Sequence, residues 1–132
     1  MFEKLKENLN NAYAPYSNFR VSCCVITKDN KGYFGVDVEN ASYGATICAE
    51  RVAITKAISQ GEKKGSFKEI HILGSSEYTM PCFICRQFFV EFFDKDVKIY
   101  VYNSDGNRKV FSMDEVCPFP FSEEDLKWKV VL

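Results

Sequence analysis

The chain has 132 residues and a formal net charge of -1, which results from 17 basic and 18 acidic side chains. Its length and its 46% content of hydrophobic residues suit one domain with a real core. Nucleic-acid binding usually needs a basic excess or a basic stripe, and neither is visible here. No segment approaches the ~20 continuous apolar residues that a membrane span requires.

These bulk properties predict a single domain over residues 1–132 that recognises a small molecule and has no nucleic-acid or membrane partner. The N-terminus alternates charged and apolar residues and lacks the apolar stretch of a signal peptide. A cytoplasmic location is therefore expected.

The first half of the chain predicts a helix, a hairpin and a second helix. Apolar residues at helical spacing indicate a helix over residues 2–12. Two segments, 21–27 and 33–38, are typical of strands joined by a short turn. The largely apolar segment 46–59 predicts the second helix.

The second half alternates strands and helices. Strands are predicted over residues 69–73, 97–102 and 109–112, and a helix over residues 82–93. A proline-flanked loop follows, after which Ser122 is typical of a helix N-cap before an acidic first turn.

This order of elements predicts an α/β fold with helices on both faces of one sheet, a three-layer α/β/α domain. The sheet is expected to have about five strands. Because the initial hairpin is antiparallel, we expect a mixed sheet rather than a wholly parallel one.

Two cysteines have the spacing of a metal half-site. Cys82 and Cys85 lie at i and i+3 at the predicted start of a helix, which places both thiols on one face. Unpaired backbone N–H groups and the helix dipole favour anions there, so both thiols are placed to ionise and bind a metal. Because the N-terminal residues do not have the pattern of a signal peptide, reduced cysteines are expected rather than disulfides.

Cys48 and Glu50 turn this half-site into a candidate catalytic centre. Cys48 also begins a predicted helix, so its thiol is favoured to ionise as well. Three protein ligands leave the fourth position of a zinc ion open for water. Glu50 by itself is an ordinary first-turn residue, but beside such a water it becomes a natural proton shuttle.

The remaining candidates for metal binding are weaker. Cys23 and Cys24 are adjacent in a strand, so they point to opposite faces of the sheet. Cys117 lies in a loop, and His71 lies inside a strand where local packing or hydrogen bonding is the alternative. If either became a fourth ligand, the site would be a closed, non-catalytic zinc module.

Five segments together resemble the small, homotetrameric, three-cysteine type of cytidine deaminase. They occur in the order of that family and run from residue 13 to residue 126. The segments are 13–19 (YAPYSNF), 39–43 (ENASY), 48–51 (CAER), 81–87 (PCFICRQ) and 121–126 (FSEEDL).

The resemblance implies a zinc-dependent hydrolase that acts on a cyclic amidine. Cys48, Cys82 and Cys85 would hold one zinc ion per chain, whose water attacks the amine-bearing carbon while Glu50 transfers protons. The implied reaction converts free cytidine or deoxycytidine into uridine or deoxyuridine and ammonia, a step of pyrimidine salvage.

The resemblance also assigns the contacts with the substrate. Phe19 would lie against the base or sugar, Asp37 and Glu39 beside the ribose, and Tyr43 in the same site. Phe121 would reach the active site of a neighbouring subunit in a homotetramer and stack on the base.

Two arginines are implied to tune the metal. Three thiolates on a divalent zinc ion leave a net charge of -1, which weakens it as a Lewis acid. Arg51 and Arg86 follow Glu50 and Cys85 directly, and the resemblance suggests hydrogen bonds from them to the sulfurs. The alternative is that each arginine pairs with a surface carboxylate.

The sequence departs from the family pattern at four places. Asp37 replaces the usual asparagine, Phe83 replaces a glycine, and Cys23 and Cys24 replace small residues. Pro120 stiffens the loop that should cross to the neighbour. Asp37 can accept a hydrogen bond but cannot donate one, and its charge argues against a phosphorylated substrate. Phe83 would narrow or reshape the pocket wall.

Two rival substrates follow from these departures and from the shared chemistry. One is another aminated pyrimidine nucleoside such as blasticidin S. The other is a polynucleotide, against which the absence of a basic stripe counts.

Overall fold

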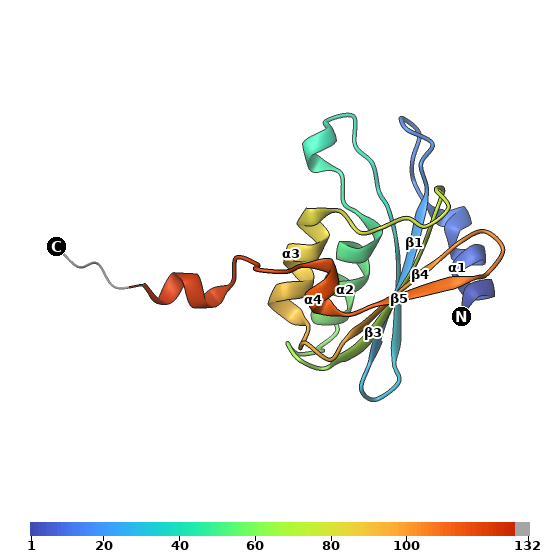
Figure 1. Ribbon diagram of the computed structural model, residues 1–132. Coiled ribbons are helices and arrows are strands. Elements are labelled where there is room, and N and C mark those ends of the chain that lie inside the picture. The colour runs from blue at the N-terminus through green and yellow to red at the C-terminus, as the bar shows by residue number, and fades with distance from the viewer. Residues whose placement is uncertain (129–132) are drawn as a thin grey trace.

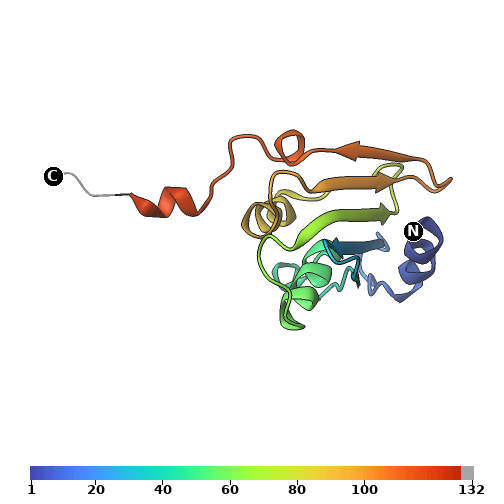
Figure 2. The same cartoon turned by 90° about the horizontal axis from the view of Figure 1, so that it is seen from below.

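A mixed five-stranded sheet forms the centre of the molecule (Figures 1 and 2). A computed structural model describes residues 1–128 and gives the strand order β2-β1-β3-β4-β5. β3 and β4 run parallel, and the other neighbours run antiparallel. The strands are β1 (Val21–Thr27), β2 (Gly32–Val36), β3 (Phe67–Gly74), β4 (Lys98–Tyr102) and β5 (Arg108–Phe111). The predicted mixed sheet is confirmed.

Helices cover both faces of the sheet, as predicted (Figure 1). One face carries α1 (Phe2–Asn8), while α2 (Ala49–Ser59), α3 (Phe83–Phe92) and the short α4 (Met113–Val116) pack on the other. The larger core lies under these three helices.

The two adjacent cysteines of β1 separate onto the two faces. Cys23 belongs to the core under α2 and α3, whereas Cys24 packs with Leu5 of α1. Both side chains are fully buried. The alternation predicted from their neighbouring positions is confirmed.

The helices that carry the candidate metal ligands begin slightly later than predicted. Cys48 and Cys82 are the N-caps of α2 and α3, so each stands just before the first helical turn. Residues 46–48 are extended because Ile47 forms an isolated bridge with Val38, with N–O distances of 2.9 and 3.0 Å. This bridge fixes where α2 can start.

Three further differences between the predicted and the observed structure concern helices. The predicted helix 2–12 ends at Asn8 and continues as a 3-10 turn, Leu9–Asn11. α4 was not predicted, although Ser112 caps it through a capping box with Glu115. The predicted N-cap at Ser122 is confirmed, but the helix that follows, Glu123–Lys127, is of the 3-10 type.

His71 makes local interactions on the face of the sheet that α1 covers. Its Nδ1 lies 2.8 Å from the Tyr102 hydroxyl and its Nε2 lies 3.1 Å from a carboxylate oxygen of Glu69. The ring stacks on Tyr100 at 4.7 Å between centroids. Burial lowers the pKa of His71, which favours the neutral ring. The locally packed alternative therefore describes this histidine.

The chain leaves the body of the domain after α4, and its C-terminal segment projects outward (Figure 1). None of the helices within residues 1–128 has the length and apolar character needed to cross a membrane.

Gly35 sets how closely α2 approaches the sheet. A Cβ atom added to Gly35 would lie 2.5 Å from the Ala49 carbonyl oxygen and 2.6 Å from the Ala53 nitrogen. We expect Gly35→Ala to lower the free energy of unfolding by about 2 kcal/mol, because backbone atoms of α2 must move. Urea denaturation measures this.

Gly44→Ala is the matched control, because a Cβ atom there meets nothing within 4 Å. Equal loss of stability in the two variants would show that the close approach at Gly35 does not limit packing.

Candidate metal centre and adjoining cavity

Three cysteine sulfurs converge where α2 and α3 begin. The Sγ atoms of Cys48, Cys82 and Cys85 all lie within 4.8 Å of one another, and those of Cys48 and Cys82 are 3.7 Å apart. Within residues 1–128 no other group of three or more His, Cys, Asp or Glu side chains has metal-binding geometry. The two helix starts bring together thiols that are 34 residues apart.

Neighbouring groups favour the ionised form of Cys48, which is the form that binds a metal. A hydrogen bond from the Cys85 thiol lowers the pKa of Cys48 to about 5, and the hydrogen bond and charge of Arg51 act in the same direction. The pKa of Cys85 is raised, first by its hydrogen bond with Cys48 and then by burial. A soft, partly ionised sulfur set of this kind suits zinc.

Glu50 is a buried carboxylate outside the sulfur group. Its side chain is 4% exposed, and burial raises its pKa to about 7. A carboxyl group with such a pKa can both accept and release a proton near neutral pH.

The two arginines have different partners. Arg51 donates from Nη2 to the Cys48 sulfur over 3.2 Å, as the resemblance implies. Arg86 instead donates to the carbonyl oxygens of Pro81 and Val116, both at 2.7 Å. Arg86 thus ties the start of α3 to the end of α4, and its hydrogen bonds go neither to a sulfur nor to a surface carboxylate.

A cavity of about 230 Å³ adjoins the sulfurs. Cys48, Cys82 and Glu50 contribute to its wall. Three side chains that the resemblance assigned to the substrate also line it: Phe19, Asp37 and Glu39. Six further lining residues were not assigned to the site from the sequence: Ser17, Val21, Thr46, Ala49, Thr79 and Met80. Ser17 and Ala49 lie inside two of the quoted motifs, which was the available signal for them.

Asp37 and Glu39 are held in different ways. Asp37 is 7% exposed, and its Oδ1 accepts a hydrogen bond from the Val21 N–H at 2.9 Å. Glu39 accepts from the backbone N–H groups of Tyr16 and Ser17 at 3.0 and 3.2 Å and from the Ser17 hydroxyl. Burial raises the pKa of Asp37, whereas the Ser17 hydroxyl lowers that of Glu39.

Three other aromatic residues, which were predicted to contact the substrate or to alter the pocket, lie outside the wall of this cavity. Tyr43 is exposed and meets Tyr16 edge to face at 6.1 Å. Phe121 is 60% exposed on the projecting C-terminal segment, where its carbonyl accepts from Gln87 at 2.8 Å. Phe83 is 70% exposed with the Arg86 guanidinium 4.3 Å from its ring centroid, so the expected narrowing of the pocket by Phe83 is not seen.

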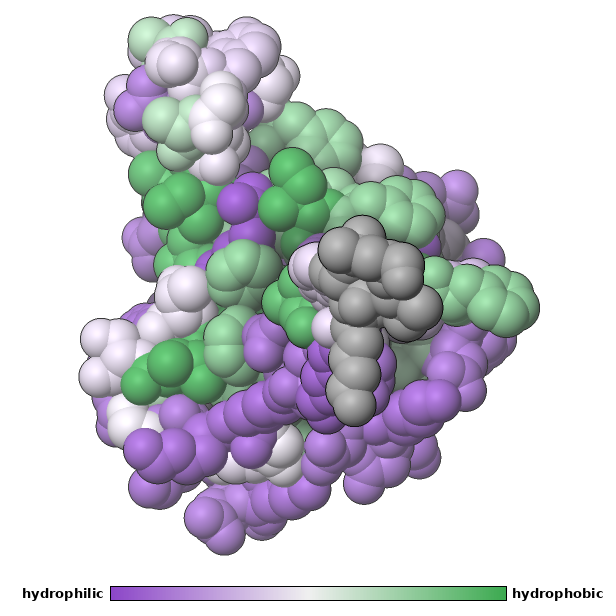
Figure 3. Space-filling model, turned by 90° about the vertical axis from the view of Figure 1, so that its left-hand side faces the viewer, coloured by the Kyte–Doolittle hydropathy of each residue, from purple (hydrophilic) through white to green (hydrophobic). Residues whose placement is uncertain are grey.

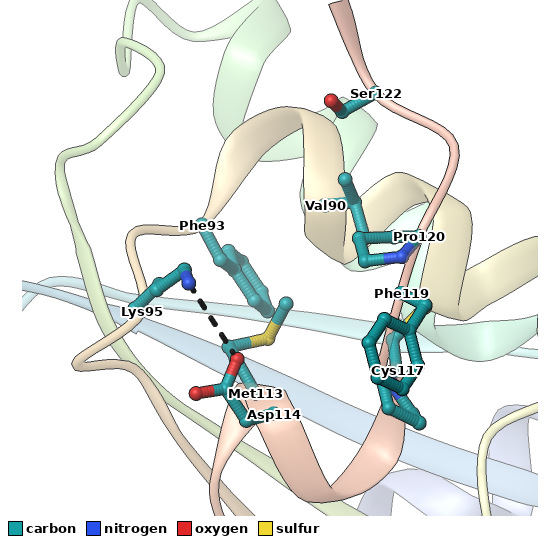
Figure 4. Close-up of a pocket in the computed structure, with 10 residues that line it drawn as sticks. Val90, Phe93, Lys95, Met113, Asp114, Cys117, Phe119, Pro120 and Ser122 are labelled. Carbon is teal, nitrogen blue, oxygen red and sulfur yellow. Dashed lines mark ion pairs between the residues drawn. The ribbon is translucent and has the colours of Figure 1, made fainter. Parts of the chain in front are cut away.

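A larger cavity, of about 630 Å³, lies beneath the C-terminal segment (Figure 4). Its wall includes Phe93 just after α3, Met113 of α4 and Cys117, and an ion pair of 3.8 Å joins its lining residues Lys95 and Asp114. None of the three clustered cysteines or Glu50 reaches it. Volume alone therefore does not identify the reactive cavity, and Cys117 is not a member of the sulfur group.

The comparisons with known proteins agree on one family. The model of the cytidine and deoxycytidylate deaminase zinc-binding region matches residues 1–101 of this chain. A cytidine deaminase of Mycoplasma genitalium is 34% identical over 116 residues, which are 88% of this chain and 88% of that protein. A probable cytidine deaminase of Dictyostelium discoideum is 44% identical over 117 residues, 87% of this chain and 77% of that protein.

Solved structures agree as well. A crystal structure of cytidine deaminase from Burkholderia pseudomallei has a TM-score of 0.86 at 38% identity and covers 90% of this chain and 94% of that one. This chain belongs to the cytidine and deoxycytidylate deaminase family, and it is accordingly a zinc-dependent hydrolytic enzyme.

We expect Cys85→Ser to abolish zinc binding, because a hydroxyl does not ionise as a thiol does and two sulfurs hold zinc poorly. Elemental analysis of the purified protein measures the zinc content. Cys117→Ser is the control and should keep about one zinc per chain. Loss of zinc in the Cys117 variant would mean that this cysteine also binds the metal.

Proposed function

We propose that this chain deaminates free cytidine and deoxycytidine to uridine and deoxyuridine. The observation that carries the proposal is the buried carboxylate of Glu50 in the wall of the same cavity as the sulfur group. The family match, which covers deaminases of both cytidine and deoxycytidylate, supports the class of reaction.

In the proposed reaction, metal binding and proton transfer are carried out by different side chains. Cys48, Cys82 and Cys85 hold zinc, which when bound supplies an ionised water near neutral pH. Glu50 takes a proton, carries it to the ring nitrogen next to the amine-bearing carbon, and later helps ammonia to leave. Arg51 withdraws charge from the Cys48 sulfur through its hydrogen bond.

The cavity wall favours a nucleoside over a nucleotide. Among residues 1–128, the lining contains the carboxylates of Asp37, Glu39 and Glu50 and no lysine or arginine. A phosphate group would therefore meet only like charge in the wall. Phe19 offers an apolar aromatic surface to the base or sugar.

The oligomeric state follows from the same proposal. We expect a homotetramer in which Phe121 of one subunit stacks on the base in the site of another. Phe121 and its neighbour Phe119 are exposed on a segment that leaves the body of the domain. Figure 3 views the face from which this segment projects, and hydrophobic side chains gather on it above a hydrophilic region. An apolar face of this kind suits contacts between copies.

The proposal places the enzyme in the cytoplasm as a single domain over residues 1–132 that serves pyrimidine salvage. It includes no nucleic-acid partner, and the sequence carries a net charge of -1. Because Asp37 departs from the family pattern, a related aminated pyrimidine nucleoside such as blasticidin S is a second candidate substrate, to be compared with cytidine.

Ammonia release from cytidine, deoxycytidine, their 5′-monophosphates, blasticidin S and single-stranded nucleic acid tests the substrate. The two free nucleosides should react fastest. Glu50→Ala should lower kcat/KM by about 10²- to 10⁴-fold, because it removes the carboxylate that transfers protons in the proposed reaction. Cytidine turnover equal to that of the Glu50 variant would refute the proposed function.

Mixing of inactive subunits tests the role of Phe121. Glu50→Ala and Phe121→Ala chains should each have low activity, and mixed assemblies should regain part of it. A site that combines an intact Glu50 with the partner's Phe121 is then complete. If verified subunit exchange restores nothing, Phe121 does not act across subunits.

A further inference from the structure

Two consecutive side chains of α3 hold the backbone of the loop that leads to the projecting C-terminal segment. Gln87 donates from Nε2 to the Phe121 carbonyl at 2.8 Å. Arg86 donates from Nη1 to the Val116 carbonyl at 2.7 Å. The loop 117–120 between these two carbonyls is therefore tied to α3 at both ends.

The same loop contains a strained residue. Phe119 has a φ of 50°, in the left-handed region that a bulky L-residue rarely adopts. Pro118 and Pro120 on either side of it limit the backbone further (Figure 4). A strained conformation of this kind persists only where the surrounding structure holds it, and it is common at functional sites.

The residues that follow Phe121 are held as well. The Ser122 N–H donates to a carboxylate oxygen of Asp125 at 2.9 Å, as part of a capping box. The Lys64 ammonium lies 3.2 Å from a carboxylate oxygen of Glu123. The backbone around Phe121 is thus anchored to its own domain on both sides.

In contrast to this backbone, the Phe121 side chain is left in solvent. Its ring is 60% exposed, although a phenylalanine gains strongly from burial. An anchored backbone reduces the ordering cost that the ring would otherwise meet when it enters a binding site. The contacts therefore orient a ring that this chain does not bury by itself.

We propose that Gln87 is a positioning residue, which holds the Phe121 backbone so that the ring enters the site of a neighbouring subunit already oriented. The proposal rests on the proposed function, in which that ring stacks on the base. Gln87 acts only through the Phe121 carbonyl. α3 then has two roles, because it carries the metal ligand Cys85 and, two residues later, the side chain that orients the ring.

Steady-state kinetics with cytidine test this role. Gln87→Glu keeps the size of the side chain but replaces the donor by a carboxylate, which cannot donate to the Phe121 carbonyl. The variant should raise KM about fivefold, the effect of one lost hydrogen bond, and keep kcat within about twofold. Its zinc content should stay at about one per chain, which shows that the metal centre is intact.

Two further variants control for charge and for the loss of the donor. Gln60→Glu makes the same chemical change at the exposed C-cap of α2 and should leave KM unchanged. Gln87→Lys restores a donor of similar reach and should return KM to within about twofold of the unaltered enzyme.

A double-mutant cycle shows whether Gln87 acts through Phe121. In a Phe121→Ala background, Gln87→Glu should change KM only about onefold, because no ring remains to be oriented. The proposal is overturned if Gln87→Glu leaves KM unchanged, or if its effect and that of Phe121→Ala add.

Amide hydrogen exchange of peptides within residues 117–128 gives a readout that needs no activity. Exchange should be faster in Gln87→Glu than in the unaltered protein and unchanged in Gln60→Glu. Equal exchange in the two variants would also overturn the proposal. Failure of the proposed function is distinct, because it shows as absent ammonia release from cytidine by the unaltered enzyme.

Discussion

The structure depends on one constraint, the meeting of two helix starts at one point beside the sheet. α2 and α3 deliver Cys48, Cys82 and Cys85 from positions at or just after their N-caps, where unpaired N–H groups favour anionic sulfur. The glycine contact between β2 and α2 brings the first helix close to the sheet, and the bridge between Val38 and Ile47 sets its first residue. The position of Cys48 is therefore set by backbone contacts of the residues on either side of it.

The negatively charged groups beside the two helix starts determine the electrostatics of the site. Thiols and three carboxylates share a small space, and Arg51 is the cation that contacts a sulfur. Burial raises the pKa of Glu50 to about 7, which suits proton transfer. The same accumulation of negative groups makes the cavity unfavourable for an anionic ligand.

Much of the fold and of the metal centre could be predicted because the signals are local. Period-two and period-3.6 patterns located all five strands and the three long helices, apart from shifts at their ends. The i, i+3 spacing of Cys82 and Cys85 placed two sulfurs together before any tertiary contact was known. The short α4 was missed, because four residues are too few to show a helical period.

By itself the sequence determined the alternation of strands and helices, the pairing of Cys82 with Cys85 and the position of Glu50 two residues after Cys48, since each depends on neighbours in the chain. Only the tertiary structure decided that Arg86 bonds to carbonyl oxygens, that Phe83 lies exposed and that Glu39 is satisfied by the Ser17 loop. It also decided that Asp37 is buried in the cavity wall, where its Oδ1 accepts from the Val21 N–H. These outcomes depend on partners distant in sequence, and no local pattern records which long-range donor or acceptor a side chain will meet.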